Sequence, residues 1–199
     1  MNLLRDILAL PEGPRRTATL VAWFQDLYET DREKPILVGG AAVELYTGGA
    51  YTTGDLDFVG SVPPAVAAAL KDAGFQRRGR HWIHEVGEIF IEFPSSGLDS
   101  GEGSVILEVE GHRVVVVDPE ALVADRLAAW QVWKSPTDGI NAWLVARGRK
   151  LDLRRLDSLV EAKGVSAAAM AFAEIVERWQ GRDPTKEELE AWARIIPDG

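Results

Sequence analysis

The segment "ILVGGAAVELYTGGAYTTGDLDFVG", which spans residues 36–60, restricts the fold of this chain more than any other stretch. Residues 35–38 predict a short buried strand, which stops at the pair Gly39-Gly40. Residues 41–46 favour a helix, which a second pair of glycines then ends. The segment therefore predicts a strand that passes into a helix through a glycine turn.

Two aspartates, Asp55 and Asp57, follow with one leucine between them in the stretch "DLDFV", whose apolar residues suit a strand. Because side chains alternate faces along a strand, the two carboxylates should point the same way and repel each other. A divalent cation relieves that repulsion, and Mg²⁺ is typically held by one or two carboxylates together with substrate phosphates. A third acid is expected on a neighbouring strand. Glu92 in the apolar stretch "IFIEF" is the first candidate, and Glu88 and Glu85 are the alternatives.

The glycine pair offers the phosphate-binding part of a site, beside the metal-binding part that the acids suggest. Free backbone N–H groups and the dipole at the start of the helix can face an anion, and a backbone without Cβ atoms can approach a phosphate closely. A phosphate-binding helix start followed by a pair of metal-binding acids describes a site for a nucleoside triphosphate. Two metal ions in such a site can stabilise both the attacking and the leaving oxygen of a nucleotidyl transfer.

The stretch "VGGAAVELYTGGAYTTGDLDFV" resembles the signature of the DNA-polymerase-β-like nucleotidyltransferase superfamily. That signature is Gly-Gly or Gly-Ser at a helix start, then Asp-x-Asp on a strand and a third acid on a later strand. With the helix "DPEALVADRLAAW" and the helices after it, the chain is similar to small bacterial nucleotidyltransferases of the abortive-infection toxin kind. The resemblance covers about residues 34–160, strongly from the glycine pair to the second aspartate and loosely beyond.

This resemblance implies a Mg²⁺-dependent enzyme, with Mn²⁺ as an alternative ion, that moves a nucleoside monophosphate from an NTP to an acceptor hydroxyl. It leaves the acceptor open among tRNA, a protein and a small molecule. If the chain is the toxin of a toxin–antitoxin pair, a cognate antitoxin is a further expected partner.

The resemblance also implies roles for individual residues. Those implied in catalysis and metal binding are Asp55, Asp57 and Glu92, with Glu92 as general base, and those implied in nucleotide binding are Gly39, Gly40, Thr53 and Arg126. Relatives often carry an arginine where this chain has Tyr51, and a lysine where it offers Arg126 or, further along, Lys134. These departures favour a second hypothesis, a degenerate and non-catalytic nucleotide-binding or protein-interaction module of the same fold.

Two other classes of protein use an Asp-x-Asp motif, and both rank lower. The phosphatase-like motif follows directly on an apolar strand, whereas "AYTTG" precedes the aspartates in this chain. Nucleotide-sugar glycosyltransferases use the motif with a metal, but 199 residues is short for one.

The rest of the chain predicts a mixed sheet followed by helices. Helices are expected at residues 17–30 and 62–75, and strands at residues 82–85, 88–93, 105–110 and 112–117. Beyond residue 117, helix starts are expected at Asp118-Pro119, at Ser135-Pro136 and at the capping box of Thr185 and Glu188. The three tryptophans expected in the core of this helical part are Trp130, Trp133 and Trp143.

The predicted fold class is α+β. It consists of a mixed-sheet nucleotidyltransferase core with helices in residues 1–117, followed by a helical C-terminal region in residues 118–199 that packs on the core.

The composition limits which partners this chain is expected to bind and in which compartment it is expected. The net charge of −9, from 31 acidic and 22 basic residues, argues against wholesale binding of a nucleic-acid backbone. The basic stretch "QRRGRHW" is interpreted as a solvated loop between strands, and contact with an RNA acceptor is the alternative. Cysteine is absent, which excludes disulfides and thiolate metal sites. The N-terminus lacks a signal-peptide layout, and no run of about 18 apolar residues occurs. A cytoplasmic protein with no membrane partner is predicted.

Overall fold

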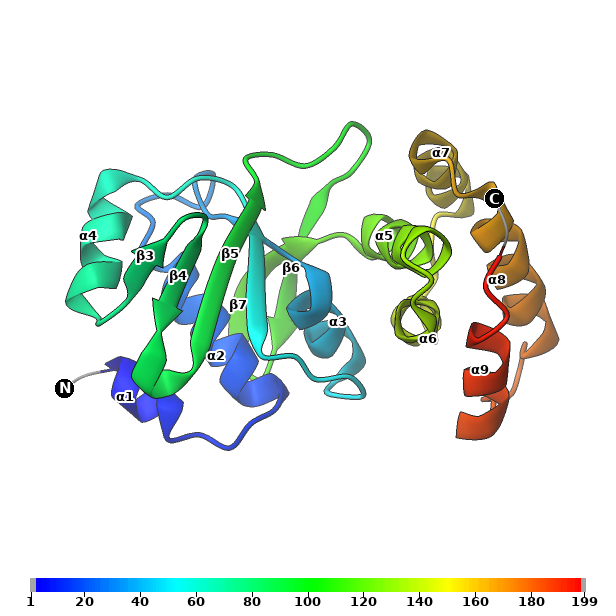
Figure 1. The fold of residues 1–199 in the computed structure, drawn as a ribbon, viewed down its shortest axis with the longest axis horizontal. Coiled ribbons are helices and arrows are strands. Elements are labelled where there is room, and N and C mark those ends of the chain that lie inside the picture. The colour runs from blue at the N-terminus through cyan, green and yellow to red at the C-terminus, as the bar shows by residue number, and fades with distance from the viewer. Residues whose placement is uncertain (1–2, 198–199) are drawn as a thin grey trace. The chain divides into compact units, whose positions relative to one another are not determined.

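The computed structural model describes residues 3–197, which divide into two compact units, the first ending at Val117 and the second beginning at Asp118. The strands of the first unit are β1 (Ile36–Val38), β2 (Asp55–Val59), β3 (Gln76–Arg78), β4 (His81–His84), β5 (Ile89–Ser95), β6 (Ser104–Val109) and β7 (His112–Val117). Within the described residues they form one seven-stranded sheet in the order β3-β4-β5-β2-β1-β7-β6 (Figure 1). Because β1 pairs antiparallel with β2 but parallel with β7, the sheet is mixed, and the predicted α+β class is confirmed.

The helices of the first unit are α1 (Leu3–Leu8), α2 (Pro14–Gln25), α3 (Gly39–Thr47) and α4 (Pro64–Asp72), with a 3-10 helix, η1 (Glu85–Gly87), between β4 and β5. Helix α2 contacts β7, and α3 contacts β1 and β2. The position of α2 differs from the predicted range 17–30 at both ends. It begins earlier because Pro14, whose fixed φ suits a first helical turn, occupies its start.

The middle of the sheet is held by apolar side chains from three adjacent strands. Leu37 on β1 lies level with Phe58 on β2 and with Val116 on β7, and all three are 0% exposed. The ring of Phe24, from α2, packs on Phe58 with the ring centres 4.8 Å apart. Burial of one such side chain stabilises the fold by roughly 1.5–3 kcal/mol. This core fixes the end of β1, where the glycine turn lies, and the strand that carries the two aspartates.

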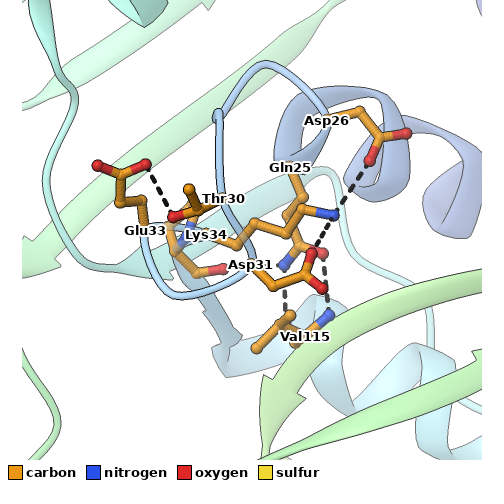
Figure 2. A network of polar contacts seen from close by, with 8 residues as sticks. Gln25, Asp26, Thr30, Asp31, Glu33, Lys34 and Val115 are labelled. Atoms are coloured by element: carbon orange, nitrogen blue, oxygen red, sulfur yellow. Dashed lines mark hydrogen bonds and ion pairs between the residues drawn. The ribbon is translucent and has the colours of Figure 1, made fainter.

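A buried amide joins α2 to the sheet (Figure 2). Gln25 is 1% exposed, and its Nε2 donates to the backbone oxygens of Pro35 and Val115, each at 2.8 Å. Its Oε1 accepts from the backbone N–H of Val115 at 2.9 Å. The side chain thus pairs with both backbone groups of Val115, as a neighbouring strand would. It therefore completes the hydrogen bonding of β7 beside the short strand β1.

Lys34, in the segment between α2 and β1, pairs with two aspartates (Figure 2). Its Nζ lies 3.2 Å from Asp26 and 3.0 Å from Asp31. Burial lowers the pKa of Lys34, but the hydrogen bonds and charges of the two carboxylates outweigh that effect, so its pKa is raised. Both carboxylates are largely exposed, and pairs of this kind contribute little to stability.

The β3–β4 hairpin corrects two sequence expectations. Residues 76–78, interpreted as part of a solvated loop, form β3, which pairs antiparallel with β4. The side chains of β3 are all exposed, so no apolar alternation marks this strand in the sequence. Strand β4 ends at His84, and Glu85, expected as the last residue of that strand, opens η1 instead.

The second unit is helical over its described residues. Its helices are α5 (Pro119–Val132), α6 (Pro136–Ala146), α7 (Leu153–Lys163), α8 (Ser166–Arg178) and α9 (Lys186–Ala193). Asp118 caps α5 by accepting from the N–H of Ala121 at 2.9 Å, and Thr185 forms the predicted capping box with Glu188. Ser135 stands at the predicted start of α6, but its side chain makes no capping hydrogen bond.

The tryptophans of the second unit divide into buried and exposed. Trp130 is 0% exposed and its Nε1 donates to the backbone oxygen of Ala193 at 2.7 Å, while Trp143 is 6% exposed. Trp133 is 79% exposed, so its assignment to the core was wrong. The residue follows the last turn of α5 as its C-cap, outside the face that packs. Across residues 3–197, no helix has the length and apolar character needed to cross a membrane.

Candidate functional site

The carboxylate of Asp57 lies against Gly39, the first residue of α3. A Cβ atom on Gly39 would lie 2.4 Å from Oδ2 of Asp57, closer than such atoms can approach. The φ of Gly39 is +66°, a conformation that glycine adopts without strain. The backbone pairing explains the contact, because Val38 lies opposite Asp57 where β1 and β2 pair. The glycine turn and the second aspartate of the sequence motif are therefore in direct contact in the fold.

The loop before β2 lies against the next residue of α3. A Cβ atom on Gly40 would lie 3.1 Å from Oγ1 of Thr53 and 3.3 Å from the ring of Tyr51. The first backbone N–H groups of a helix have no partners within the helix. Val38 precedes α3 as N-cap and supplies no side-chain capping bond. The start of α3 thus offers N–H donors beside the hydroxyl of Thr53, which suits an anion such as phosphate.

The three acids predicted as a set belong to two adjacent, parallel strands. Asp57 on β2 is paired with Glu92 on β5, and Asp55 is paired with Phe90. Paired residues on neighbouring strands share a face of the sheet, and so do residues two apart on one strand. Asp55, Asp57 and Glu92 therefore lie on one face. Asp55 is exposed, and the other two are partly buried.

Glu92 is engaged by two basic side chains. Its Oε1 lies 2.6 Å from Nε of Arg80, and its Oε2 lies 3.2 Å from Nε2 of His81. Sequence reasoning missed this pairing, because Arg80 belongs to the stretch interpreted as a solvated loop. The sequence feature that could have revealed the pairing is the short spacing between that stretch and "IFIEF", which allows the hairpin strand β4 to pair with β5.

The two alternative third acids lie elsewhere. Glu85 is exposed and pairs with Arg78. Glu88 is also exposed and directly follows η1, with a φ of +50°. Neither is paired with an aspartate of β2, whereas Glu92 is. Among the three candidates, Glu92 has the position beside Asp57.

The side chains fit a bound metal only in part. Among residues 3–197, no three His, Asp or Glu side chains lie in an arrangement that could hold a metal ion. The pair Asp55 and Asp57 matches the one or two carboxylates by which Mg²⁺ is usually held, with phosphate oxygens and water as further ligands. Glu92 would join such a set only after leaving Arg80 and His81.

Arg126 and Lys134, proposed from the sequence for the triphosphate, lie in the second unit. Nη1 of Arg126 is 2.8 Å from Oδ1 of Asp138, and the Nε of the same guanidinium is buried without a hydrogen-bond partner. Lys134 follows α5 with a φ of +55° and is exposed. The nucleotide role of Arg126 stays a prediction.

An open pocket of about 580 Å³ lies at the start of β2. It is lined by Thr53 and Asp55, by residues of α2 and β5, and by Glu44 of α3. Glu44 is 1% exposed, a burial that sequence reasoning did not identify. Burial raises the pKa of Glu44, and Glu12 adds to the rise. Hydrogen bonds from the side chain of Thr17 and the backbone of Thr53 act in the opposite direction.

Comparison with known proteins supports the fold. No protein-family profile matches this sequence, and no curated protein matches it. Among solved structures, the chain is similar to an antigenic nucleotidyltransferase-like protein from Paracoccidioides brasiliensis, with a TM-score of 0.53. The match covers 96% of this chain and 97% of that chain, at 15% sequence identity. At that identity the likeness concerns the fold, which is nucleotidyltransferase-like.

Proposed function

We propose that this protein is a Mg²⁺-dependent nucleotidyltransferase that moves a nucleoside monophosphate from an NTP to an acceptor hydroxyl. The observation that supports the proposal is the contact between Gly39 and Asp57, which brings the start of α3 against the second aspartate of the motif. Neither half alone is specific, because glycine pairs end many strands and Asp-x-Asp occurs at many strand ends. Their direct contact is what a nucleotide site with a phosphate cradle and a metal requires.

In this proposal the start of α3 holds the phosphates. The N–H groups at Gly39 and Gly40 donate to phosphate oxygens, and the Thr53 hydroxyl donates from the side. Asp55 and Asp57 would hold Mg²⁺, which would supply positive charge to offset the charge that develops on the phosphates. These N–H groups and the Thr53 hydroxyl also fix the position of the triphosphate relative to the acceptor, since position accounts for much of the rate of such transfers.

Glu92 is the proposed general base. The acceptor oxygen bonds to the α-phosphorus while the bond to pyrophosphate breaks, and the acceptor proton passes to the Glu92 carboxylate. For that role Glu92 has to be released from Arg80 and His81, whose side chains are 64% and 41% exposed and can turn into solvent. The Arg80–Glu92 pair would then be a resting arrangement that substrate binding opens.

A second candidate function is a nucleotide-binding or protein-interaction module without catalysis. The observation that favours it is the ring of Tyr51, which lies beside Gly40 where similar proteins often have a cation. An aromatic ring cannot neutralise a triphosphate as a guanidinium does. A role as the toxin of a toxin–antitoxin pair is likewise a proposal. A gene for a small regulator beside the gene for this chain would support it.

Nucleotide binding tests the site directly. The affinity for each NTP should be measured by calorimetry with and without Mg²⁺ in the wild type and in Asp57→Asn. We expect Mg²⁺-dependent binding in the wild type and its loss in the variant, with an unchanged circular dichroism spectrum. Asp72→Asn, which removes an exposed carboxylate at the end of α4, is the control and should bind as the wild type does. Equal Mg²⁺-dependent affinity in Asp57→Asn would contradict the site assignment.

A further inference from the structure

Within residues 3–197 the sheet has two edge strands, β3 and β6, and their side chains differ. All three side chains of β3 are exposed and two are arginines, and charges on an edge strand hinder pairing with another chain. Strand β6, "SVILEV", carries one charged residue, Glu108, and no proline. It pairs with β7 in a regular register from Ser104 to Val109, so no bulge bends this edge away. Strand β6 therefore lacks most of the features that keep an edge strand from pairing.

Apolar side chains lie on both faces of β6. Val105 and Leu107 are paired with Val116 and Val114 of β7, which are both 0% exposed, and Ile106 lies on the other face. Val105 is 39% exposed, Ile106 is 51% exposed, and Leu107 is only partly buried. An unbroken apolar run is typical of a strand that is covered on both faces. Strand β6 thus has the side chains of an inner strand at the edge of the sheet.

We propose that β6 pairs antiparallel with β6 of a second copy of this chain, with Ile106 at the twofold axis. Such a contact uses the same surface of both copies and continues one sheet into the other. The axis stands perpendicular to the sheet, so residues that lie opposite each other have to belong to the same face. With Ile106 opposite its own copy, Val105 lies opposite Leu107 and Ser104 lies opposite Glu108. The apolar residues of one strand then cover those of the other.

The charge of Glu108 selects this register. Opposite Ser104 the carboxylate faces a hydroxyl that can donate to it, and like charges, which destabilise a pair of strands when directly opposite, do not meet. A register with Leu107 at the axis would place the carboxylate opposite Ile106. One with Val105 at the axis would bring it opposite Glu102, in the loop before β6. The register centred on Ile106 is thus the most favourable of the three.

The net charge of the chain also favours contact at this edge. At a net charge of −9, two copies repel each other over most of their surfaces. The apolar residues of β6 carry no charge, and Arg113 of β7 partly offsets Glu108, since its Nε lies 3.8 Å from Oε1 of that residue. Two copies can therefore approach each other most closely along β6.

The alternative between two copies is pairing of β6 with β3. That contact would set the arginines of β3 beside the apolar residues of β6, and it would match three residues with six. It is also a head-to-tail contact, which adds copies without limit unless the rotation closes a ring. Twofold pairing covers the apolar edges of both copies at once and stops at a dimer.

Sedimentation velocity of the full chain over a range of concentrations tests the dimer. The variants are Ile106→Lys and, as control, Val86→Lys, because Val86 is a 94% exposed apolar residue of η1, outside β6. We expect a dimer in the wild type. Ile106→Lys sets two ammonium groups opposite each other and should raise the dimer dissociation constant at least roughly tenfold, whereas Val86→Lys should leave it unchanged. A wild type that is monomeric throughout, or equal dissociation constants in the wild type and Ile106→Lys, would overturn the inference.

Single cysteines test the register, because the chain has none of its own. Directly opposite residues of an antiparallel pair have Cα atoms about 4.5–5.5 Å apart, which a disulfide can span. In the proposed register Ile106→Cys meets its copy, whereas Ser104→Cys lies roughly 13 Å from its copy along the strands. We expect copper phenanthroline to link Ile106→Cys into dimers while Ser104→Cys and Val86→Cys stay unlinked. Equal rates of linkage in the three variants would overturn the register.

The same samples distinguish the other ways of covering β6. Species that grow beyond the dimer would overturn the twofold contact in favour of the head-to-tail one. A monomer in which the Ile106→Cys thiol reacts slowly with a maleimide would show that another part of the chain covers the strand. A monomer in which that thiol reacts fast would leave the edge to a strand of a different protein. None of these measurements uses a nucleotide, so their outcome is independent of the proposed function.

Discussion

Asp57 occupies the space in which a side chain on Gly39 would lie, since a Cβ atom there would come within 2.4 Å of Oδ2. The two residues are distant in the sequence but meet because β1 and β2 pair antiparallel, with Val38 opposite Asp57. This contact sets the distance between the start of α3 and the acid. The geometry of the proposed site therefore depends on the absence of a side chain at position 39.

Gly39→Ala is expected to lower the free energy of unfolding by more than the positive φ at this position alone would. Gly48→Ala is the matched control, because Gly48 also has a positive φ, +62°, but a Cβ there would meet no atom within 4 Å. The control should lose about 1–2 kcal/mol from the left-handed conformation. Gly39→Ala should lose at least about 1 kcal/mol more, because Asp57 has to move. Urea denaturation of both variants measures the difference, and equal losses would refute the contact.

Arg80→Gln is expected to strengthen the apparent affinity for Mg²⁺ in the presence of NTP. The substitution removes one of the two basic partners of Glu92 and leaves only His81, so the carboxylate becomes more available to the metal site. Because Arg80 is exposed, the fold should lose less than about 1 kcal/mol. Arg77→Gln is the control of equal charge, since Arg77 lies over the ring of Trp82 and donates to Gly79 instead. If both variants leave Mg²⁺ affinity unchanged, Glu92 has no part in metal binding.

Glu44→Gln should change the pH dependence of stability. Because the pKa of Glu44 is raised in the folded protein, the unfolded chain loses this proton first as the pH rises. The associated stability is complete below the unfolded pKa and is lost as the pH rises through the folded pKa. Glutamine has no such loss, so the unfolding free energy of Glu44→Gln minus that of the wild type should grow from pH 4 to pH 8. A constant or falling difference in urea titrations, or the same change in the exposed control Glu108→Gln, would contradict the burial of a titrating carboxyl.

Gln25→Leu should be strongly destabilising, although the shape of the side chain is nearly kept. It leaves the backbone oxygen of Pro35 without its partner, and both backbone groups of Val115 without the partners seen in Figure 2. Orphaned groups of this kind cost roughly 1–3 kcal/mol each, so we expect a loss of at least about 2 kcal/mol. Lys34→Met, which breaks only the ion pairs beside it, should cost less than about 1 kcal/mol. Comparable losses of stability in the two variants, measured by thermal unfolding, would show that the Gln25 amide does not hold α2 to the sheet.

Local patterns made much of the fold predictable. The glycine turn, the helix after it and the aspartate strand all follow from periodicity and from the conformational freedom of glycine. The hairpin at Gly111 and the caps at Asp118 and Thr185 follow from turn and capping chemistry in the same way. Glu92 could be chosen because an acid inside an apolar strand is costly without a partner.

The remaining features depend on contacts between distant segments. Strand β3 is made of exposed polar residues and exists because β4 pairs with it, so its sequence alone reads as a loop. The partners of Glu92 depend on the register of β4 against β5. Glu44 looks like an ordinary helical residue in "AAVELYT", and its burial arises only from the packing of α2 and the loop before β2 around it. Such placements require the register and packing that the structure supplies.

The most direct test of the proposed function is the transfer of label from each α-labelled NTP, with Mg²⁺, to a pool of cellular RNA, protein and small molecules. We expect transfer by the wild type and by Asp72→Asn, and a rate lower by roughly 10² to 10³-fold in Asp57→Asn, because electrostatic stabilisers act mainly on the transition state. NTP binding by the wild type without transfer to any acceptor would contradict the enzyme and support the binding module. Transfer that is as fast in Asp57→Asn as in the wild type would contradict the site.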